Sequence, residues 1–268
     1  MKRVHHSSDL WQYLKSYEQR ASVLLHKFHF QVKMDEQVDR LIKKLQGLYI
    51  KTPPHQRLMI AISGIPGSGK STLAKVIVTR INLLYPSNTE KVAVCVPMDG
   101  FHFTRAQLDA FPNPQIAHFR RGAPFTFDSQ SLFLLVKALR QPLSSTTPTI
   151  CAPSFSHIGK DPIKDDITIK PVARILIFEG NYLSLDAKRW RDVADLFDER
   201  WFLKIDFEVA ESRLISRHLA AGIVKSRDDA RKRVLENDLV NGKEISENQY
   251  RVDELITTKD TKDWENII

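Results

Sequence analysis

Residues 64–71 read Gly-Ile-Pro-Gly-Ser-Gly-Lys-Ser and match, in frame, the pattern Gly-x-x-x-x-Gly-Lys-Ser/Thr. The glycines of such a loop let backbone N–H groups turn toward one anion, and the lysine reaches the outer phosphates of a nucleotide. The hydroxyl after the lysine is suited to ligate Mg²⁺, which assigns Ser71 to the metal. The predicted nucleotide contacts are Gly64, Ile65, Pro66, Gly67, Ser68, Gly69, Lys70, Ser71 and Thr72.

The segments on either side of this loop have the patterns of a strand and a helix. Residues 58–62 form a short apolar run, which is typical of a buried parallel strand. From Ser71 to Tyr85 apolar residues recur with helical spacing, at Leu73, Ala74, Ile77, Val78, Ile81 and Leu84. The amino end of this predicted helix would direct its partial positive charge at the phosphates.

The composition is that of a globular chain in a reducing compartment. Of the 268 residues 42% are hydrophobic, and no apolar run approaches the roughly 20 residues of a membrane span. Cys95 and Cys151 lie in apolar, strand-like stretches, so we expect buried free thiols rather than a disulfide or a metal site. These features predict a cytoplasmic protein without a membrane span.

The net charge of +8 and the pI near 9.4 suggest nucleic-acid binding as one hypothesis. The charge is unevenly distributed, because residues 1–33 carry six lysines and arginines against two acidic residues. Half of the surplus therefore lies in this segment, and the rest of the chain is only mildly basic. A phosphate-handling site needs a surplus of that size in any case, so the charge does not favour nucleic acid as a partner.

Residues 1–33 are predicted to form a basic amphipathic extension, with apolar residues spaced alternately by four and three. Three interpretations remain open: a docking helix or tail, a mitochondrial presequence, or a natural start at Met34. The presence of only two arginines and of Glu18 argues against the presequence. A helical lead-in is predicted over 34–56, and the domain that carries the loop over 57–268.

The rest of the chain alternates strand-like and helical patterns. Helices are predicted over 35–50, Thr104–Phe111, Ser129–Arg140 with Asp128 as N-cap, Ala187–Leu196, Val209–Ala221 and Arg227–Val240. Strands are predicted over Lys91–Pro97, Thr149–Ala152, Arg174–Phe178, Trp201–Ile205 and Arg251–Ile256. This alternation predicts an α/β fold: the three-layer sandwich of P-loop NTPases, with a mostly parallel sheet, helices on both faces and a helical lid.

Two carboxylates follow strands and would therefore lie at the ligand-binding edge of the sheet. Asp99 comes after the strand Lys91–Pro97, where it could accept the proton of an attacking hydroxyl as a general base. Glu179 ends the apolar run Ile175–Phe178 and is predicted to hold Mg²⁺ or its water shell. A turn aspartate and an ordinary strand-end glutamate are the alternatives, and the phosphate loop favours the functional interpretation.

Two polar segments are candidates for substrate binding. Arg120 and Arg121 precede a Gly-Ala-Pro turn and could hold an anionic group through charge-assisted hydrogen bonds, although a solvated basic turn would have the same sequence. Ser156 and His157 follow a predicted strand, in a segment whose mixture of aromatic and polar residues suits an acceptor pocket. A structural or exposed role is the alternative for His157.

The segment from Glu211 to Arg233 is rich in basic residues and predicts a lid over the triphosphate, with a solvated helix face as the alternative. Arg217 is the predicted catalytic arginine, because the following residues 219–222 have the pattern of a helix end near a hinge. Together with Lys70 it would neutralise the charge that develops during a transfer of phosphate.

Five segments carry a family resemblance: GIPGSGKST, MDGFH, RRGAPFTFD, APSFSH and LIFEGNYL, in that order. They resemble the bacterial pantothenate kinase, uridine kinase and phosphoribulokinase group of P-loop kinases, and most closely its uncharacterised branch of ATP-dependent kinase-like proteins. The resemblance extends from Arg57 to Ile256. Two departures leave the acceptor open: residues 154–156 replace the Tyr-Asp-Phe run of uridine kinases, and the RRGAP segment replaces the lysine-rich turn of pantothenate kinases.

The resemblance implies an ATP-dependent small-molecule kinase that uses Mg²⁺ and phosphorylates an alcohol group. It implies Asp99 as the base, Glu179 as the metal support, Ser156 and His157 in the acceptor pocket, and Arg217 in the lid. Nucleosides, pantothenate-like compounds and sugar or acid acceptors all remain candidates. A regulatory GTPase would need an Asn-Lys-x-Asp run, which the sequence lacks. The alternative function is a P-loop NTPase module that binds nucleic acid or a protein partner without a small-molecule acceptor.

Overall fold

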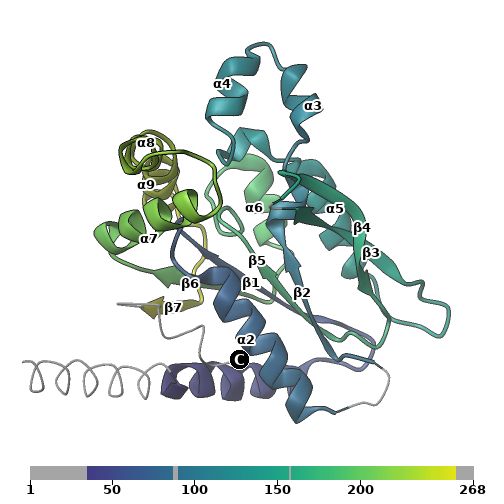
Figure 1. The fold of residues 1–268 in the computed structure, drawn as a ribbon. Coiled ribbons are helices and arrows are strands. Elements are labelled where there is room, and N and C mark those ends of the chain that lie inside the picture. Colours follow the sequence, from purple (N-terminus) through teal and green to yellow (C-terminus); the bar gives the residue numbers. More distant parts are fainter. Residues whose placement is uncertain (1–34, 87–89, 157, 258–268) are drawn as a thin grey trace, which may run out of the picture.

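The computed structural model describes residues 35–86, 90–156 and 158–257, so the predicted extension 1–33, Met34 and His157 lie outside the described residues. Within these ranges one parallel sheet has the strand order β2-β5-β1-β6-β7 (Figure 1). Its strands are β1 (Leu58–Gly64), β2 (Ala93–Pro97), β5 (Ile175–Glu179), β6 (Glu199–Lys204) and β7 (Glu254–Thr257). Each one falls where the sequence predicts a strand.

The sheet is buried on both faces, because successive side chains of a strand enter two different apolar clusters. In β1, Leu58, Ile60 and Ile62 belong to one cluster, whereas Met59 and Ala61 belong to the other. The same alternation continues in β5 and β6. Continuous apolar runs are therefore required here, as the sequence pattern indicates.

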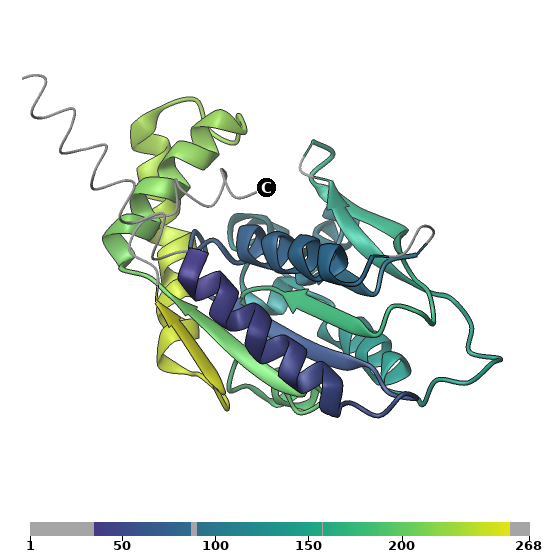
Figure 2. The same ribbon diagram turned by 90° about the horizontal axis from the view of Figure 1, so that it is seen from below.

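Helices cover the two faces of the sheet. Helix 35–51 and α2 (Lys70–Leu84) share a cluster with one face, and Figure 2 shows both on the near side of the strands. α5 (Ser129–Leu139), α6 (Lys188–Ala194) and α9 (Leu239–Glu247) contribute to the cluster on the other face. In the described ranges, no helix combines the length and apolar character that crossing a membrane requires. The predicted three-layer α/β sandwich is confirmed.

A separate antiparallel hairpin is formed by β3 (Ile150–Ser156) and β4 (Asp161–Ile169). The predicted strand Thr149–Ala152 is thus longer than expected, and β4 has no counterpart in the sequence predictions because most of its side chains are exposed. Cys151 is exposed on this hairpin, which stands apart from the main sheet, so its predicted burial is wrong. Cys95 is partly buried in β2, and both thiols are free as predicted.

A short helix lies within the predicted range Thr104–Phe111, and a second short helix, which was not predicted, follows it. α3 (Arg105–Asp109) is followed by α4 (Pro114–Phe119), and together they project from the carboxyl edge of the sheet (Figure 1). The side chain of Asn113 caps α4, and proline occupies the first helical position. The pair Asn113-Pro114 is therefore a signal for the start of a helix, and it could have been recognised in the sequence.

A helical subdomain follows β6, and one of its predicted helices is interrupted. The segment Arg227–Val240 is not one α-helix, because α8 (Arg227–Arg233) is separated from α9 by a π-helical turn over Val234–Asp238. α7 (Phe207–Ala220) and α8 form an apolar cluster of their own, made of Leu214, Ile215, Ala230 and Val234. A π turn is wider than an α turn and rotates the residues that follow it. The segment Arg227–Val240 is therefore helical as predicted, but it contains a π turn, and the helix continues to Glu247, beyond the predicted end.

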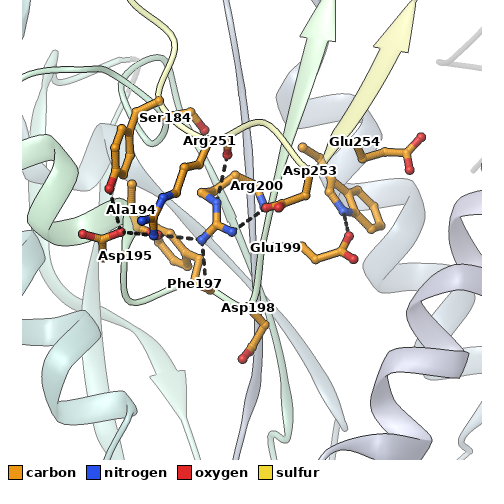
Figure 3. A network of polar contacts seen from close by, with 12 residues as sticks. Ser184, Ala194, Asp195, Phe197, Asp198, Glu199, Arg200, Arg251, Asp253 and Glu254 are labelled. Atoms are coloured by element: carbon orange, nitrogen blue, oxygen red, sulfur yellow. Dashed lines mark hydrogen bonds and ion pairs between the residues drawn. The ribbon is translucent and has the colours of Figure 1, made fainter.

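The far end of the sheet is fixed by Arg200 at the start of β6 (Figure 3). Its guanidinium donates hydrogen bonds to the carbonyl oxygens of Ala194, Phe197 and Arg251, at 3.1, 2.9 and 2.9 Å. It also forms an ion pair with Asp253 at 2.6 Å. These bonds hold the chain that returns from α9 against β6, so β7 joins the sheet in parallel register.

Candidate active site

The carboxyl ends of β1, β2 and β5 meet at one edge of the sheet. In the strand register Glu179, the last residue of β5, lies between Ile62 of β1 and Pro97 of β2. The phosphate loop begins two residues after Ile62, and Asp99 lies two residues after Pro97. Strand pairing therefore brings the loop, Asp99 and Glu179 to the same edge from distant parts of the sequence.

The phosphate loop leads directly into the amino end of α2. Gly69 is the N-cap of α2 in a left-handed conformation, with φ of 96°, and no side chain caps this end. The first backbone N–H groups of the helix are thus suited to an anion. At Gly67, whose φ is 78°, a Cβ would lie 3.1 Å from both the carbonyl oxygen of Ala210 and Cγ of Leu214. α7 therefore packs directly on the loop.

The two predicted metal ligands are in contact, because Ser71 Oγ donates a hydrogen bond to Glu179 Oε2 at 3.0 Å. Burial, and then the charge of Asp99, raise the pKa of Glu179 to about 7, while Lys70, Ser71 and Lys75 oppose this shift. A hydroxyl and a carboxylate are ligands that Mg²⁺ takes, and a cation here would favour the charged carboxylate. The described residues hold no group of three His, Cys, Asp or Glu suited to a metal.

Lys70 is buried beneath the loop, with 7% of its surface exposed. Its Nζ donates a hydrogen bond to the carbonyl oxygen of Ile65 at 2.9 Å. Burial, and to a smaller extent the charge of Arg217, lower the pKa of Lys70 to about 8 against the opposing effect of the charges of Glu179 and Asp99. The pKa of Lys70 is thus influenced by the charges of three other residues predicted for the site, which are Asp99, Glu179 and Arg217.

Asp99 lies in a 3₁₀ turn, Met98–Phe101, directly after β2, and its side chain is 44% exposed. His102 Nδ1 lies 2.8 Å from the carbonyl oxygen of Asp99, and because a carbonyl only accepts, this nitrogen carries a proton. The His102 ring also lies against Phe127 and Phe155, with centroid separations of 3.9 and 4.9 Å. The sequence predictions omitted His102, although it stands three residues after Asp99 in the same motif.

Gly100, next to Asp99, is where the 3₁₀ turn meets the hairpin. A Cβ at Gly100 would lie 2.2 Å from the carbonyl oxygen of Pro153, closer than real Cβ atoms approach. We expect Gly100→Ala to destabilise the protein by roughly 1–3 kcal/mol, because the strained contact is with backbone that cannot move aside. Thermal or urea unfolding measures this change.

Gly47→Ala is the matched control for that measurement. Nothing lies within 4 Å of a Cβ built at Gly47, which belongs to helix 35–51. Alanine is expected to stabilise this helix by about 0.5–1 kcal/mol. Equal stabilities for Gly100→Ala and the wild type would contradict the close approach of the hairpin.

α7 presents two arginines one helical turn apart toward this region. Arg213 Nη1 donates a hydrogen bond to the carbonyl oxygen of Gly67 at 3.0 Å. Arg217 is exposed, and its charge influences the pKa of Lys70, so it lies on the side of α7 near the loop. The sequence predictions selected Arg217 and missed Arg213, which the four-residue spacing on one helix face could have identified.

Both arginines of the Arg120–Gly122 turn contact protein groups. Arg120 Nη2 donates to Asn241 Oδ1 at 2.7 Å. Arg121 Nη2 donates to Asp161 Oδ1 at 2.8 Å, and its guanidinium lies 5.6 Å from the ring centroid of Phe155. The turn is therefore joined to α9 on one side and to the β3–β4 hairpin on the other.

Ser156 ends β3 and takes part in the turn of the hairpin. Its Oγ accepts a hydrogen bond from the N–H of Gly159 at 2.8 Å. Arg121 bonds to Asp161 in the next strand of the same hairpin, and Asp161 pairs with Ser156, so Arg121 and Ser156 lie at the same end of this hairpin. His157 lies outside the described residues, and its place in the acceptor pocket stays a prediction.

The chain has sequence relatives among kinases. The ATP-dependent kinase-like protein notR' of Aspergillus versicolor is 46% identical over 159 residues, which cover 59% of this chain and 92% of that protein. The ATP-dependent kinase YFH7 of Saccharomyces cerevisiae is 34% identical over 194 residues, which cover 62% of this chain and 55% of YFH7. The crystal structure of YFH7 superposes with a TM-score of 0.74 and 26% identity, covering 83% of this chain and 99% of that chain.

A family model gives the family assignment directly. Residues 59–223, from β1 to just beyond α7, match the model of the Phosphoribulokinase / Uridine kinase family. The match includes the phosphate loop, Asp99, Glu179 and both arginines of α7. The resemblance carried by the five sequence segments is thereby confirmed, and the chain belongs to the phosphoribulokinase and uridine kinase family of P-loop kinases.

Proposed function

We propose that this kinase transfers the γ-phosphate of ATP to an alcohol group of a small metabolite. The observation that carries the proposal is the Ser71–Glu179 hydrogen bond at the strand edge that also bears Asp99. A nucleotide loop alone would suit any NTPase. A second carboxylate beside the phosphates is what a hydroxyl acceptor requires.

The donor side consists of the loop Gly64–Thr72 and the residues beneath it. ATP phosphates would lie along the backbone N–H groups of the loop, with Lys70 directed to the outer phosphates. Ser71 and Glu179 would hold Mg²⁺, which supplies positive charge to the phosphate oxygens when bound. The contact between these two oxygens and the raised pKa of the Glu179 carboxyl both support this assignment.

The transfer itself would depend on Asp99. Its carboxylate would take the proton of the acceptor hydroxyl while that oxygen bonds to the γ-phosphorus and the bond to the bridging oxygen of ADP breaks. The products are a phosphate ester and ADP, and the proton passes from Asp99 to solvent. Lys70 and Arg217 would neutralise the negative charge on the transferred group. The 44% exposure of the Asp99 side chain leaves it accessible to a hydroxyl.

The proposed acceptor wall comprises Arg120, Arg121, Ser156 and His157. Two guanidinium groups in one wall suit an acceptor that carries a carboxylate or a phosphate. Arg120 is the better candidate for direct contact, because its bond from Nη1 to the carbonyl oxygen of Glu236 is long, at 3.4 Å. The guanidinium of Arg121 donates to more protein groups, namely Lys160, Phe103 and Asp161, and would shape the wall.

A labelled-phosphate screen tests this function. The protein is incubated with a metabolite extract and ATP that carries ¹⁸O in its γ-phosphate, and new phosphate esters are identified by mass spectrometry. We expect one labelled ester that requires Mg²⁺ and does not form with Asp99→Asn. Consumption of ATP without any labelled ester would contradict an alcohol acceptor and favour the NTPase module.

A further inference from the structure

α9 lies between the phosphate loop and the Arg120–Gly122 turn. At Gly242, a Cβ would lie 3.4 Å from Cβ of Ile65 in the loop and 3.3 Å from Cε1 of Phe207 in α7. The helix therefore packs closely against the donor loop, and a side chain here would require Phe207 or Ile65 to shift by a few tenths of an ångström. Movement of the loop at Ile65 is restricted by the position of α9.

The residue next to Gly242 contacts the opposite side of the site. Asn241 is 1% exposed, and its Oδ1 accepts the hydrogen bond from Arg120 Nη2 at 2.7 Å. One turn earlier, Asn237 is also 1% exposed, and its Nδ2 donates to the carbonyl oxygen of Arg121 at 3.1 Å. Two buried amides of one helical face thus bond to the same turn.

Stabilisation of α9 alone does not explain the hydrogen bonds of Asn237 and Asn241. Each amide makes its hydrogen bond to a turn more than one hundred residues away in the chain, whereas Asn237 Oδ1 is buried with no hydrogen-bond partner among the described residues. The π turn Val234–Asp238 includes Asn237 and immediately precedes α9, so it sets the direction in which both amides lie. π turns of this kind are frequent at functional sites.

We propose that Asn237 and Asn241 are positioning residues, which couple the nucleotide loop to the acceptor turn through α9. Nucleotide binding would restrict the loop at Ile65, α9 would be held by its contact at Gly242, and the Arg120–Gly122 turn would be ordered through the two amides. The coupling itself needs only nucleotide binding. Its consequence for catalysis rests on the proposed function, in which this turn faces the acceptor.

Amide hydrogen exchange with and without nucleotide tests the coupling. Exchange is followed by mass spectrometry in peptides that span residues 118–127, with saturating Mg²⁺ and adenylyl imidodiphosphate as the probe. In the wild type we expect nucleotide to slow exchange of this turn by about 5-fold or more, the lower end of typical coupling between sites. Saturation of each variant is verified by titration.

Three variants make the test specific. Asn241→Leu removes the acceptor of the Arg120 bond and is expected to abolish the nucleotide-dependent slowing, whereas Asn241→Asp keeps an acceptor oxygen and is expected to retain it. Arg120→Met removes the same hydrogen bond at the arginine, which is the more exposed partner. This variant tests the coupling if Asn241→Leu does not fold. Asn248→Leu is the matched control, because the side chain of this exposed asparagine donates its hydrogen bond within α9, to the carbonyl oxygen of Glu244.

If the two asparagines only stabilised the fold, the experiment would give a different result. The variants would then change the thermal stability while the nucleotide-dependent difference in the turn stayed the same. That result, or a wild-type turn that nucleotide does not slow, would overturn the proposal. Neither readout involves phosphoryl transfer, so failure of the coupling is distinguishable from failure of the proposed function.

Discussion

Replacement of Asp99 by asparagine is expected to reduce phosphoryl transfer by roughly 10²–10⁴-fold while the affinity for ATP stays close to that of the wild type. The amide keeps the size of the side chain but cannot take the proton of the acceptor. Affinity is preserved because two electrostatic effects oppose each other. Loss of the Asp99 charge favours the ionised form of Glu179, and it also removes one attraction on the charged form of Lys70.

Single-turnover transfer to the acceptor found by the screen, together with titration of a fluorescent ATP analogue, measures both quantities for Asp99→Asn. Asp166→Asn is the matched control, because it removes the same charge from an exposed position on β4. Its transfer rate should equal that of the wild type. A fully active Asp99→Asn enzyme would exclude Asp99 as the base.

Lys70→Ala is expected to impair both nucleotide binding and transfer, with the rate of transfer lower by roughly 10²–10³-fold. Lys70 lies beneath the loop and would contact the phosphates in the ground state as well as during transfer. Its substitution therefore differs from that of Asp99, which acts on the acceptor alone. The titration of the fluorescent ATP analogue and the single-turnover assay distinguish the two variants, because only Lys70→Ala is expected to lose affinity for ATP as well as transfer rate.

The fold of the Lys70→Ala variant is expected to be retained. Burial already disfavours the charged lysine, as its lowered pKa indicates, so the side chain contributes little to stability before nucleotide binds. Thermal unfolding verifies this point. Lys91→Ala, at an exposed position before β2, is the control for loss of a positive charge. Wild-type affinity for ATP in Lys70→Ala would contradict the place of Lys70 beneath the phosphates.

Most of the main sheet could be predicted from the sequence because its strands are buried on both faces. Continuous apolar runs identify β1 and β5, and the glycine loop after β1 fixes the direction of the chain. β4 could not be found in this way, since its pairing with β3 depends on tertiary contacts and its side chains are largely exposed. The π turn at Val234–Asp238 is likewise invisible, because α and π turns share the same residue preferences over five residues.

Among the site residues that could be predicted from the sequence are those that directly follow or end a strand. Asp99 and Glu179 could be selected because both follow apolar strands that end at one edge of a parallel sheet. Arg217 could be selected from the predicted helix end, but the bond of Arg213, one turn earlier on the same face, to Gly67 depends on the packing of α7 on the loop. The partners of Arg120 and Arg121 were equally hidden, because Asn241 and Asp161 reach them only through the tertiary fold.

The order of the strands also affects how this protein meets other copies of itself. In the part of the chain that the structure describes, β2 and β7 are the outer strands of the main sheet. Glu254 of β7 forms ion pairs with Arg40 and Lys44 at 2.7 and 3.0 Å, so charge lies at this edge. β2 ends at Pro97, which has no N–H to offer. Charged residues and proline at the edge of a sheet disfavour the addition of a strand from another chain, so both features act against aggregation by strand addition.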